Sequence, residues 1–147
     1  MLTIDASVHI SELSQTEPGA ADSRALLSYV RQKFVPVYCP TLLSVEVAAS
    51  VARIYNDTAQ GLAVARTLRA LTNYEWVTLD VTLAQDAARI GATYRLRGAD
   101  AVYAAVAQRH NSTLVTLDKQ QSERLAPIVM TQGPADALLA LQALLGP

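Results

Sequence analysis

Four carboxylates stand in stretches of this sequence that are otherwise apolar. Asp5 and Asp118 each follow a short apolar run, "LTI" and "LVTL", that is typical of a buried strand. Glu46 lies inside the apolar segment "LLSVEVAASV", and Asp100 opens the alanine-rich segment "DAVYAAVA". Carboxylates are rarely buried without a partner, so four of them in such surroundings indicate a functional cluster.

A cluster of this kind needs a cation or protons to be stable. Two carboxylates about 4 Å apart repel each other by about 4 kcal/mol at an effective dielectric constant of about 20. Four of them would cancel a large share of the roughly 5–15 kcal/mol that keeps a domain folded. Cys39 is the only cysteine, and the only histidines are His9 and His110, which we expect to be ordinary surface residues. An all-oxygen cluster suits Mg²⁺ or Mn²⁺ rather than zinc.

Each carboxylate also has a purely structural interpretation. Asp5 could cap the first helix, and Asp118 could belong to a turn. Asp100 could stabilise the dipole of its own helix. Glu46 could pair with Arg53, which lies seven residues later on the same helix face. These interpretations stay open for each acid alone, whereas the set of four favours a site.

The elements that position these carboxylates follow from the apolar pattern. Short apolar strands alternate with helices, which is typical of a parallel sheet covered on both faces. We expect strands at residues 2–4, 35–39, 75–79, 113–117 and 127–131. We expect helices at about residues 7–14, 20–33, 40–56, 60–71, 81–94, 100–110 and 134–145. Ligands of such sheets bind at the carboxyl ends of the strands, where Asp5 and Asp118 fall, and we expect their strands to be neighbours.

Composition limits the class of protein. The 147 residues suit a single domain, 1–147, and 51% of them are apolar, which excludes a disordered chain. A net charge of −1 gives no global positive field for a polyanion partner. A lone cysteine fits a reducing compartment, and the sequence has no apolar run long enough for a membrane span. The first ten residues lack a basic region and a long apolar run, so we expect no signal peptide. We therefore expect a cytoplasmic protein without a membrane partner.

Four short motifs occur in a fixed order: "TIDAS", a proline six residues before Glu46, "GADAVYAAVA" and "LVTLD". This set resembles the PIN-domain family, in particular the small VapC-type toxins of prokaryotic toxin–antitoxin pairs. The resemblance implies a three-layer α/β/α sandwich with a mostly parallel five-stranded sheet, and a Mg²⁺- or Mn²⁺-dependent endoribonuclease. It also implies that the hydroxyl of Thr116 supports the metal ligands. The metal ligands that it implies are Asp5, Glu46, Asp100 and Asp118.

The resemblance also implies a mechanism. A bound metal would hold a phosphate oxygen and lower the pKa of a water molecule that attacks the phosphorus. Asp118 is our candidate for the base that takes the proton of this water. Because carboxylates repel phosphate, we expect Arg97 and Lys119 to hold RNA at the rim, with Ser7 as a further candidate for support or contact. The alternative is that Arg97 and Lys119 are ordinary surface charges that bind no RNA. Residues 120–122 offer no acid where some relatives have one, which puts a second metal site in doubt.

Two other classes of function remain open. A haloacid-dehalogenase-like phosphatase also places an aspartate after its first strand and binds Mg²⁺. It normally has a second aspartate two residues later, where this chain has Ser7. The other class is a PIN-like module that binds RNA or a partner without catalysis. The presence of all four acids argues against it. A metal titration would test it, because a module that only binds should neither bind Mn²⁺ at this site nor cut RNA.

Besides an RNA substrate, the resemblance implies two protein partners, a cognate antitoxin and a second copy of the chain in a homodimer. The helices expected at 20–33 and 60–71 carry apolar residues on more than one face. A groove between them would accept a partner helix. The alternative is that these apolar residues complete the core.

Overall fold

Five parallel strands form the sheet at the centre of the molecule. The computed structural model describes residues 1–146. The strands are β1 (Leu2–Ile4), β2 (Val37–Pro40), β3 (Tyr74–Val77), β4 (Thr113–Val115) and β5 (Thr131–Gln132). Their order is β3-β2-β1-β4-β5, and every neighbouring pair is parallel. Because Ile4 at the end of β1 lies opposite Val115 at the end of β4, Asp5 and Asp118 leave neighbouring strands, as predicted.

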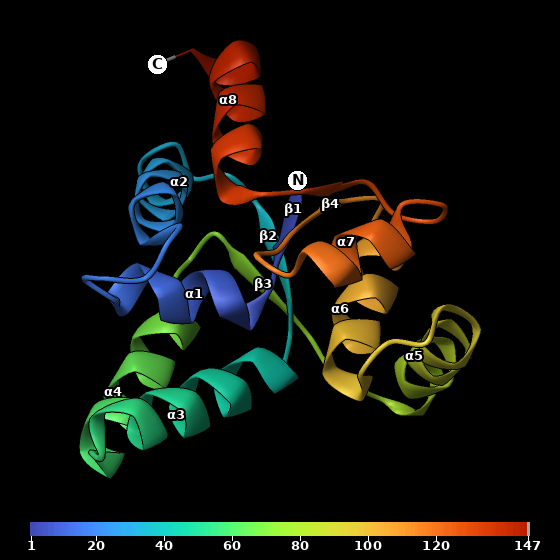
Figure 1. Ribbon diagram of the computed structural model, residues 1–147, viewed down its shortest axis with the longest axis horizontal. Coiled ribbons are helices and arrows are strands. Elements are labelled where there is room, and N and C mark those ends of the chain that lie inside the picture. Colours follow the sequence, from blue (N-terminus) through green and yellow to red (C-terminus); the bar gives the residue numbers. More distant parts are fainter. Residues whose placement is uncertain (147) are drawn as a thin grey trace.

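Helices cover both faces of this sheet. They are α1 (Ala6–Leu13), α2 (Ala20–Gln32), α3 (Leu42–Tyr55), α4 (Thr58–Arg69), α5 (Val81–Tyr94), α6 (Gly98–Arg109), α7 (Lys119–Leu125) and α8 (Pro134–Leu145). Figure 1 shows α5, α6 and α7 on one side of the sheet and the other helices on the opposite side. The predicted three-layer α/β/α sandwich is therefore confirmed. No helix within residues 1–146 is long and apolar enough to cross a membrane.

The position of Asp100 is fixed by the packing of α6. This helix lies against β1, β2 and β4, and α5 packs against it in turn. Every residue from Asp100 to Ala107 is buried as a result. The small alanine side chains let the helix approach the sheet closely, while Tyr103 and Val106 fill the core. Asp100 thus lies in the first turn of a helix that is held by neighbours along its length.

On the opposite side of the sheet, α3 and α4 form a closely packed helical pair. Gly61 of α4 is the point of closest approach. A Cβ atom at this position would lie 2.9 Å from the Cβ of Ala52 and closer still to the carbonyl oxygen of Ala48. Glycine is therefore required for the spacing that sets the direction of α3, the helix that carries Glu46.

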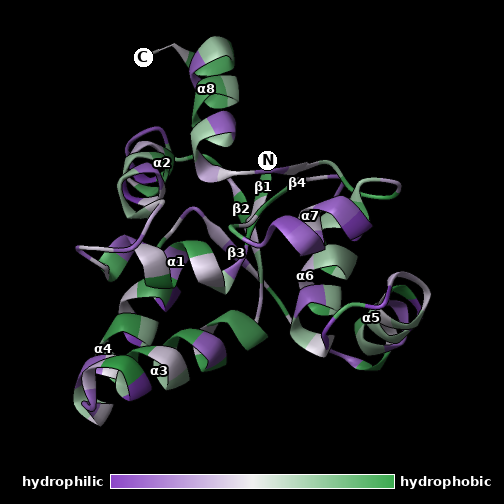
Figure 2. Ribbon diagram, viewed as in Figure 1, coloured by the Kyte–Doolittle hydropathy of each residue, from purple (hydrophilic) through white to green (hydrophobic). Residues whose placement is uncertain are grey.

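The segment after β4 differs from the expectation. No apolar period predicts a helix there, yet Lys119–Leu125 form α7. This helix is short and mostly hydrophilic (Figure 2), with only Gln121 and Leu125 buried. The strand expected at 127–131 is wrong in position, because the chain first turns after α7 and pairs with β4 only at Thr131–Gln132. Val129 is still buried, so the apolar residues of this turn serve the core.

The prediction of a groove between α2 and α4 is also wrong, because α2 is not the main neighbour of α4. α2 packs mainly against α1 and α8, whereas α4 packs against α3. Leu26, Leu27 and Val30 of α2 are fully buried, so the alternative interpretation holds and they complete the core. The exposed large apolar side chains of this region lie instead on α3 and α4, at Val45, Ile54, Tyr55 and Leu62.

Candidate active site

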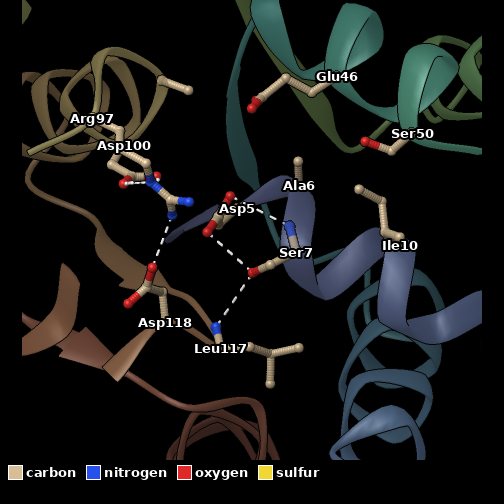
Figure 3. Close-up of a pocket in the computed structure, with 11 residues that line it drawn as sticks. Asp5, Ala6, Ser7, Ile10, Glu46, Ser50, Arg97, Asp100, Leu117 and Asp118 are labelled. Carbon is tan, nitrogen blue, oxygen red and sulfur yellow. Dashed lines mark hydrogen bonds and ion pairs between the residues drawn. The ribbon is translucent and has the colours of Figure 1, made fainter. Parts of the chain in front are cut away.

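A cavity of about 470 Å³ opens at the carboxyl ends of β1 and β4. Its lining brings together the four carboxylates predicted from the sequence, Asp5, Glu46, Asp100 and Asp118 (Figure 3). Asp5 and Asp118 follow β1 and β4, and their side chains cap α1 and α7. Glu46 lies in α3 and Asp100 in the first turn of α6. Four separate elements therefore deliver one carboxylate each to the same cavity.

Asp5 is a buried carboxylate held by hydroxyl groups. Its side chain accepts a hydrogen bond from Ser7 Oγ at 3.0 Å and another from Thr116 Oγ1 at 2.8 Å. Burial raises the pKa of Asp5, and the two hydroxyl groups oppose this rise, while the charge of Asp100 adds to it. No cationic side chain within residues 1–146 forms an ion pair with Asp5. Its charged form would therefore gain much from a bound cation.

Thr116 and Ser7 tie the ends of the two strands together. The backbone N–H of Asp118 donates to Thr116 Oγ1 at 3.1 Å, and that of Leu117 donates to Ser7 Oγ at 3.3 Å. The Thr116 hydroxyl also lies 2.7 Å from Oε1 of the buried Gln121. Since a hydroxyl has a single proton, it serves either Asp5 or Gln121 at any moment. This network fixes Asp5 relative to the chain that leads into Asp118.

Arg97 lies between two of the carboxylates instead of at the rim alone. Its Nε donates to Asp100 Oδ2 at 2.8 Å, and its Nη2 donates to Asp118 Oδ2, also at 2.8 Å (Figure 3). The pKa of Arg97 is raised by the hydrogen bond and charge of Asp100. Its side chain is nevertheless 73% exposed, so these contacts are open to water and to other cations.

Glu46 has a neutral partner rather than Arg53. Its Oε2 accepts a hydrogen bond of 2.6 Å from the hydroxyl of Tyr103, a fully buried residue of α6. Burial raises the pKa of Glu46, the Tyr103 hydrogen bond lowers it, and the charges of Asp5 and Asp100 raise it further. Burial likewise raises the pKa of Tyr103, so this hydroxyl remains a donor at neutral pH. The alternative pairing of Glu46 with Arg53 is wrong, because Arg53 forms no ion pair within residues 1–146.

Two polar residues of the site did not emerge from the sequence. Tyr103 follows Asp100 by three residues, and Ser50, which also lines the cavity, follows Glu46 by four. Residues three or four positions apart lie on the same face of a helix, so each of these residues shares a face with the acid of its helix. This spacing is the sequence signal that could have identified them. Lys119, expected at the rim, is exposed at the start of α7 and does not line this cavity.

The two histidines lie outside the cavity lining, and one of them contradicts the expectation. His9 is buried, with 3% of its surface exposed, and packs edge-on against Tyr74. Burial lowers the pKa of His9 to about 3, and the charge of Arg31 contributes. His110 is partly buried and stacks on Tyr38, with ring centroids 4.0 Å apart.

The donor chemistry of the cavity suits a divalent cation that prefers oxygen. Its titratable lining groups are four carboxylates and Arg97, without histidine or cysteine. Across residues 1–146, no three acidic, histidine or cysteine side chains stand close enough together to hold a metal ion as they are. Arg97 provides the positive charge between Asp100 and Asp118. The residues thus fit Mg²⁺ or Mn²⁺ in kind, and Arg97 would have to release at least one of its partners.

Comparison with known proteins identifies the family. A sequence model of the PIN domain matches residues 2–126, which is most of the chain. The chain belongs to the PIN-domain family. No curated protein sequence matches it significantly.

Solved structures of similar fold include several toxin–antitoxin proteins. VapC20 of Mycobacterium tuberculosis, described as a sarcin-ricin loop cleaving toxin, has a TM-score of 0.72 at 15% identity, over 88% of this chain and 97% of that chain. DNA-bound VapBC from Salmonella typhimurium has a TM-score of 0.69 at 14% identity, over 90% and 97% of the two chains. PAE2754 from Pyrobaculum aerophilum has a TM-score of 0.67 at 21% identity, over 97% and 96%. At these identities the likeness establishes the fold alone.

Proposed function

We propose that this PIN-domain protein is a metal-dependent endoribonuclease and the toxin of a toxin–antitoxin pair. One observation carries the proposal: four carboxylates from four elements line a single cavity at the carboxyl ends of β1 and β4. A fold does not by itself imply a function, so the function is inferred from the chemistry of this cavity.

Asp5, Glu46, Asp100 and Asp118 would hold Mg²⁺ or Mn²⁺, with the number of ions left open. When bound, such an ion polarises a phosphate oxygen and lowers the pKa of a water molecule. The raised pKa values of Asp5 and Glu46 support this assignment, because each reflects a buried carboxylate whose charge is poorly compensated.

The remaining roles fall to groups around the carboxylates. Thr116 and Ser7 would keep Asp5 oriented through their hydroxyl groups. Asp118 is more accessible than Asp5, the other acid at a strand end, and would accept the proton of the attacking water. Arg97 would turn from its acidic partners to the RNA phosphate, and Lys119, exposed beside Asp118, remains a second candidate for contact with RNA.

Two protein partners are part of the same proposal, an antitoxin and a second copy of the chain. The toxin–antitoxin complexes among the proteins of similar fold support the antitoxin. The exposed apolar side chains Val45, Ile54, Tyr55 and Leu62 on α3 and α4 support a partner that buries them.

A PIN-like module that binds RNA or a partner without cutting is the second candidate function. The ion pairs of Arg97 with Asp100 and Asp118 favour it, since they give two of the acids a structural role. Membership of the PIN-domain family leaves the phosphatase alternative without support.

The test is cleavage of total RNA by the purified chain with Mn²⁺ and with EDTA, followed by sequencing of the product ends. We expect cuts at defined sites that require metal and that disappear in Asp100→Asn. The control is Asp86→Asn, because Asp86 pairs with Arg89 and Arg109 away from the cavity. RNA binding without any cleavage would favour the second candidate, and equal cleavage in EDTA would exclude a metal mechanism.

A further inference from the structure

A second, smaller cavity adjoins the carboxylate cavity. It measures about 160 Å³ and lies between α7 and the loop that joins α5 to α6. The two cavities share Arg97, Asp100 and Asp118, so a ligand that crosses this boundary touches both.

Two further arginines, Arg95 and Arg124, line the smaller cavity. Arg95 ends α5 in a left-handed conformation, with φ of 56°. The Nη1 atom of Arg124, on α7, donates to the backbone carbonyl of Arg95. This contact ties the loop to α7 and leaves the other N–H groups of the Arg124 guanidinium available for a ligand.

The cavity is positively charged, because three arginines and only two acids line it. Its two acids, Asp100 and Asp118, already share Arg97. Neither Arg95 nor Arg124 forms an ion pair with a carboxylate anywhere in residues 1–146. Two guanidinium groups without an ion pair in residues 1–146 therefore line one small space beside the candidate active site, and three arginines against two acids give it a net charge of +1.

The volume of this cavity and its arginines indicate which ligand it would bind. Pockets for drug-sized molecules measure about 300–1,000 Å³, so 160 Å³ is too small for a whole nucleotide. A single phosphate group is small, and the planar fork of an arginine matches its oxygens with two parallel hydrogen bonds. We propose that this cavity binds an internal phosphodiester of the RNA, next to the one that is cut, through Arg95 and Arg124. The proposal rests on the nuclease function proposed above, and it assigns the groups that hold the strand in register with the carboxylates.

The test measures binding of a single-stranded RNA oligonucleotide by fluorescence anisotropy in EDTA, over a series of salt concentrations. Arg95→Asn removes the charge with a residue that tolerates positive φ, and Arg124→Gln keeps a donor for the carbonyl of Arg95. Arg66→Gln is the matched control, since Arg66 is an exposed arginine of α4 without an ion pair in residues 1–146. Equal melting temperatures of all variants would show that the fold is intact.

We expect the double variant to bind RNA several-fold more weakly. The slope of log K against log salt should fall by about 0.7, the value for one lost phosphate contact on a single strand. Addition of a 5′-phosphate to the RNA should leave the affinity of the unaltered protein unchanged. A gain that the double variant lacks would instead assign the cavity to a terminal phosphate and overturn the proposal.

Undiminished RNA binding by the double variant would also overturn the inference, and the nuclease function would stand if Mn²⁺-dependent cleavage persisted. Loss of antitoxin binding with normal RNA binding would assign the two arginines to the partner protein. Failure of the unaltered protein both to bind and to cut any RNA would remove the nuclease function and this inference together.

Discussion

The two buried aspartates of the site have different environments. Asp5 is surrounded by hydroxyl donors and lacks a cation, whereas Asp100 has Arg97 beside it. Asp118 divides its oxygens between two roles: Oδ1 accepts the N–H of Gln121 at 3.0 Å, and Oδ2 faces Arg97. A carboxylate that caps a helix with one oxygen keeps the other for a ligand. These individual environments decide which acids need a metal ion and which can release Arg97 to receive it.

Replacing Thr116 with valine tests the support of Asp5. Valine keeps the shape of the side chain but removes the hydroxyl that donates to Asp5 at 2.8 Å. Loss of a group that orients a metal ligand typically lowers metal affinity about 10–100-fold, and we expect this range for Mn²⁺ measured by calorimetry. Thr113→Val, at the start of β4, is the control, because within residues 1–146 its hydroxyl hydrogen-bonds only to the sulfur of Met130. Equal Mn²⁺ affinity of Thr116→Val and the unaltered chain would contradict the role of Thr116.

Two short strands and two helices position the four acids of the site. β1 and β4 have three residues each, and the acids stand directly after or close to their ends. α6 and α3 supply the other two acids, and the hydrogen bond from Tyr103 to Glu46 connects these helices across the cavity. The orientation of α3 depends in turn on its close contact with α4.

Gly61→Ala is expected to disturb that contact. The added methyl group would clash with the backbone of α3, and overpacking of this kind costs about 1–3 kcal/mol of unfolding free energy. Urea unfolding measures the change. Gly98→Ala is the control, because a Cβ at Gly98 meets no atom within 4 Å. A Gly61→Ala variant as stable as the unaltered chain would show that α3 and α4 can separate without loss.

For the whole molecule, His9 makes stability depend on pH. Its pKa is about 3 in the folded state against 6.5 for an unperturbed histidine. The unfolded chain therefore binds a proton in this window that the folded chain does not. Stability falls as pH drops from 6.5 toward 3, by up to about 1.4 kcal/mol per pH unit. The raised pKa values of Asp5 and Glu46 act in the opposite sense at the acid end, because the folded state binds their protons first.

Urea unfolding in EDTA, at neutral pH and about one unit below pH 6.5, measures this dependence near the start of the window. We expect lower stability at the acid pH for the unaltered chain and for His110→Gln, the control. His9→Leu should lose most of the difference, since it removes the titrating group. The same pH dependence in His9→Leu would place the cause in other residues.

The sequence predicted the parts of the fold that an apolar pattern marks. β1 and β4 are short apolar runs that lie in the core, and the four acids stood out because their neighbours are apolar. α7 has no such pattern, and its start depends on the cap that Asp118 provides. The burial of His9 is set by how α1 packs against other elements, which residue type does not reveal. The bridge from Arg97 to Asp118 links residues that only the fold brings together.

The central claim is that the cavity of Asp5, Glu46, Asp100 and Asp118 holds a divalent metal ion. The most direct test is a crystal structure of the chain with Mn²⁺, in which anomalous scattering locates the ion. We expect a peak in this cavity with carboxylate oxygens about 2 Å away, and Arg97 turned from Asp100 or Asp118. A cavity without an anomalous peak at saturating Mn²⁺, with Arg97 still bridging the two aspartates, would contradict the account.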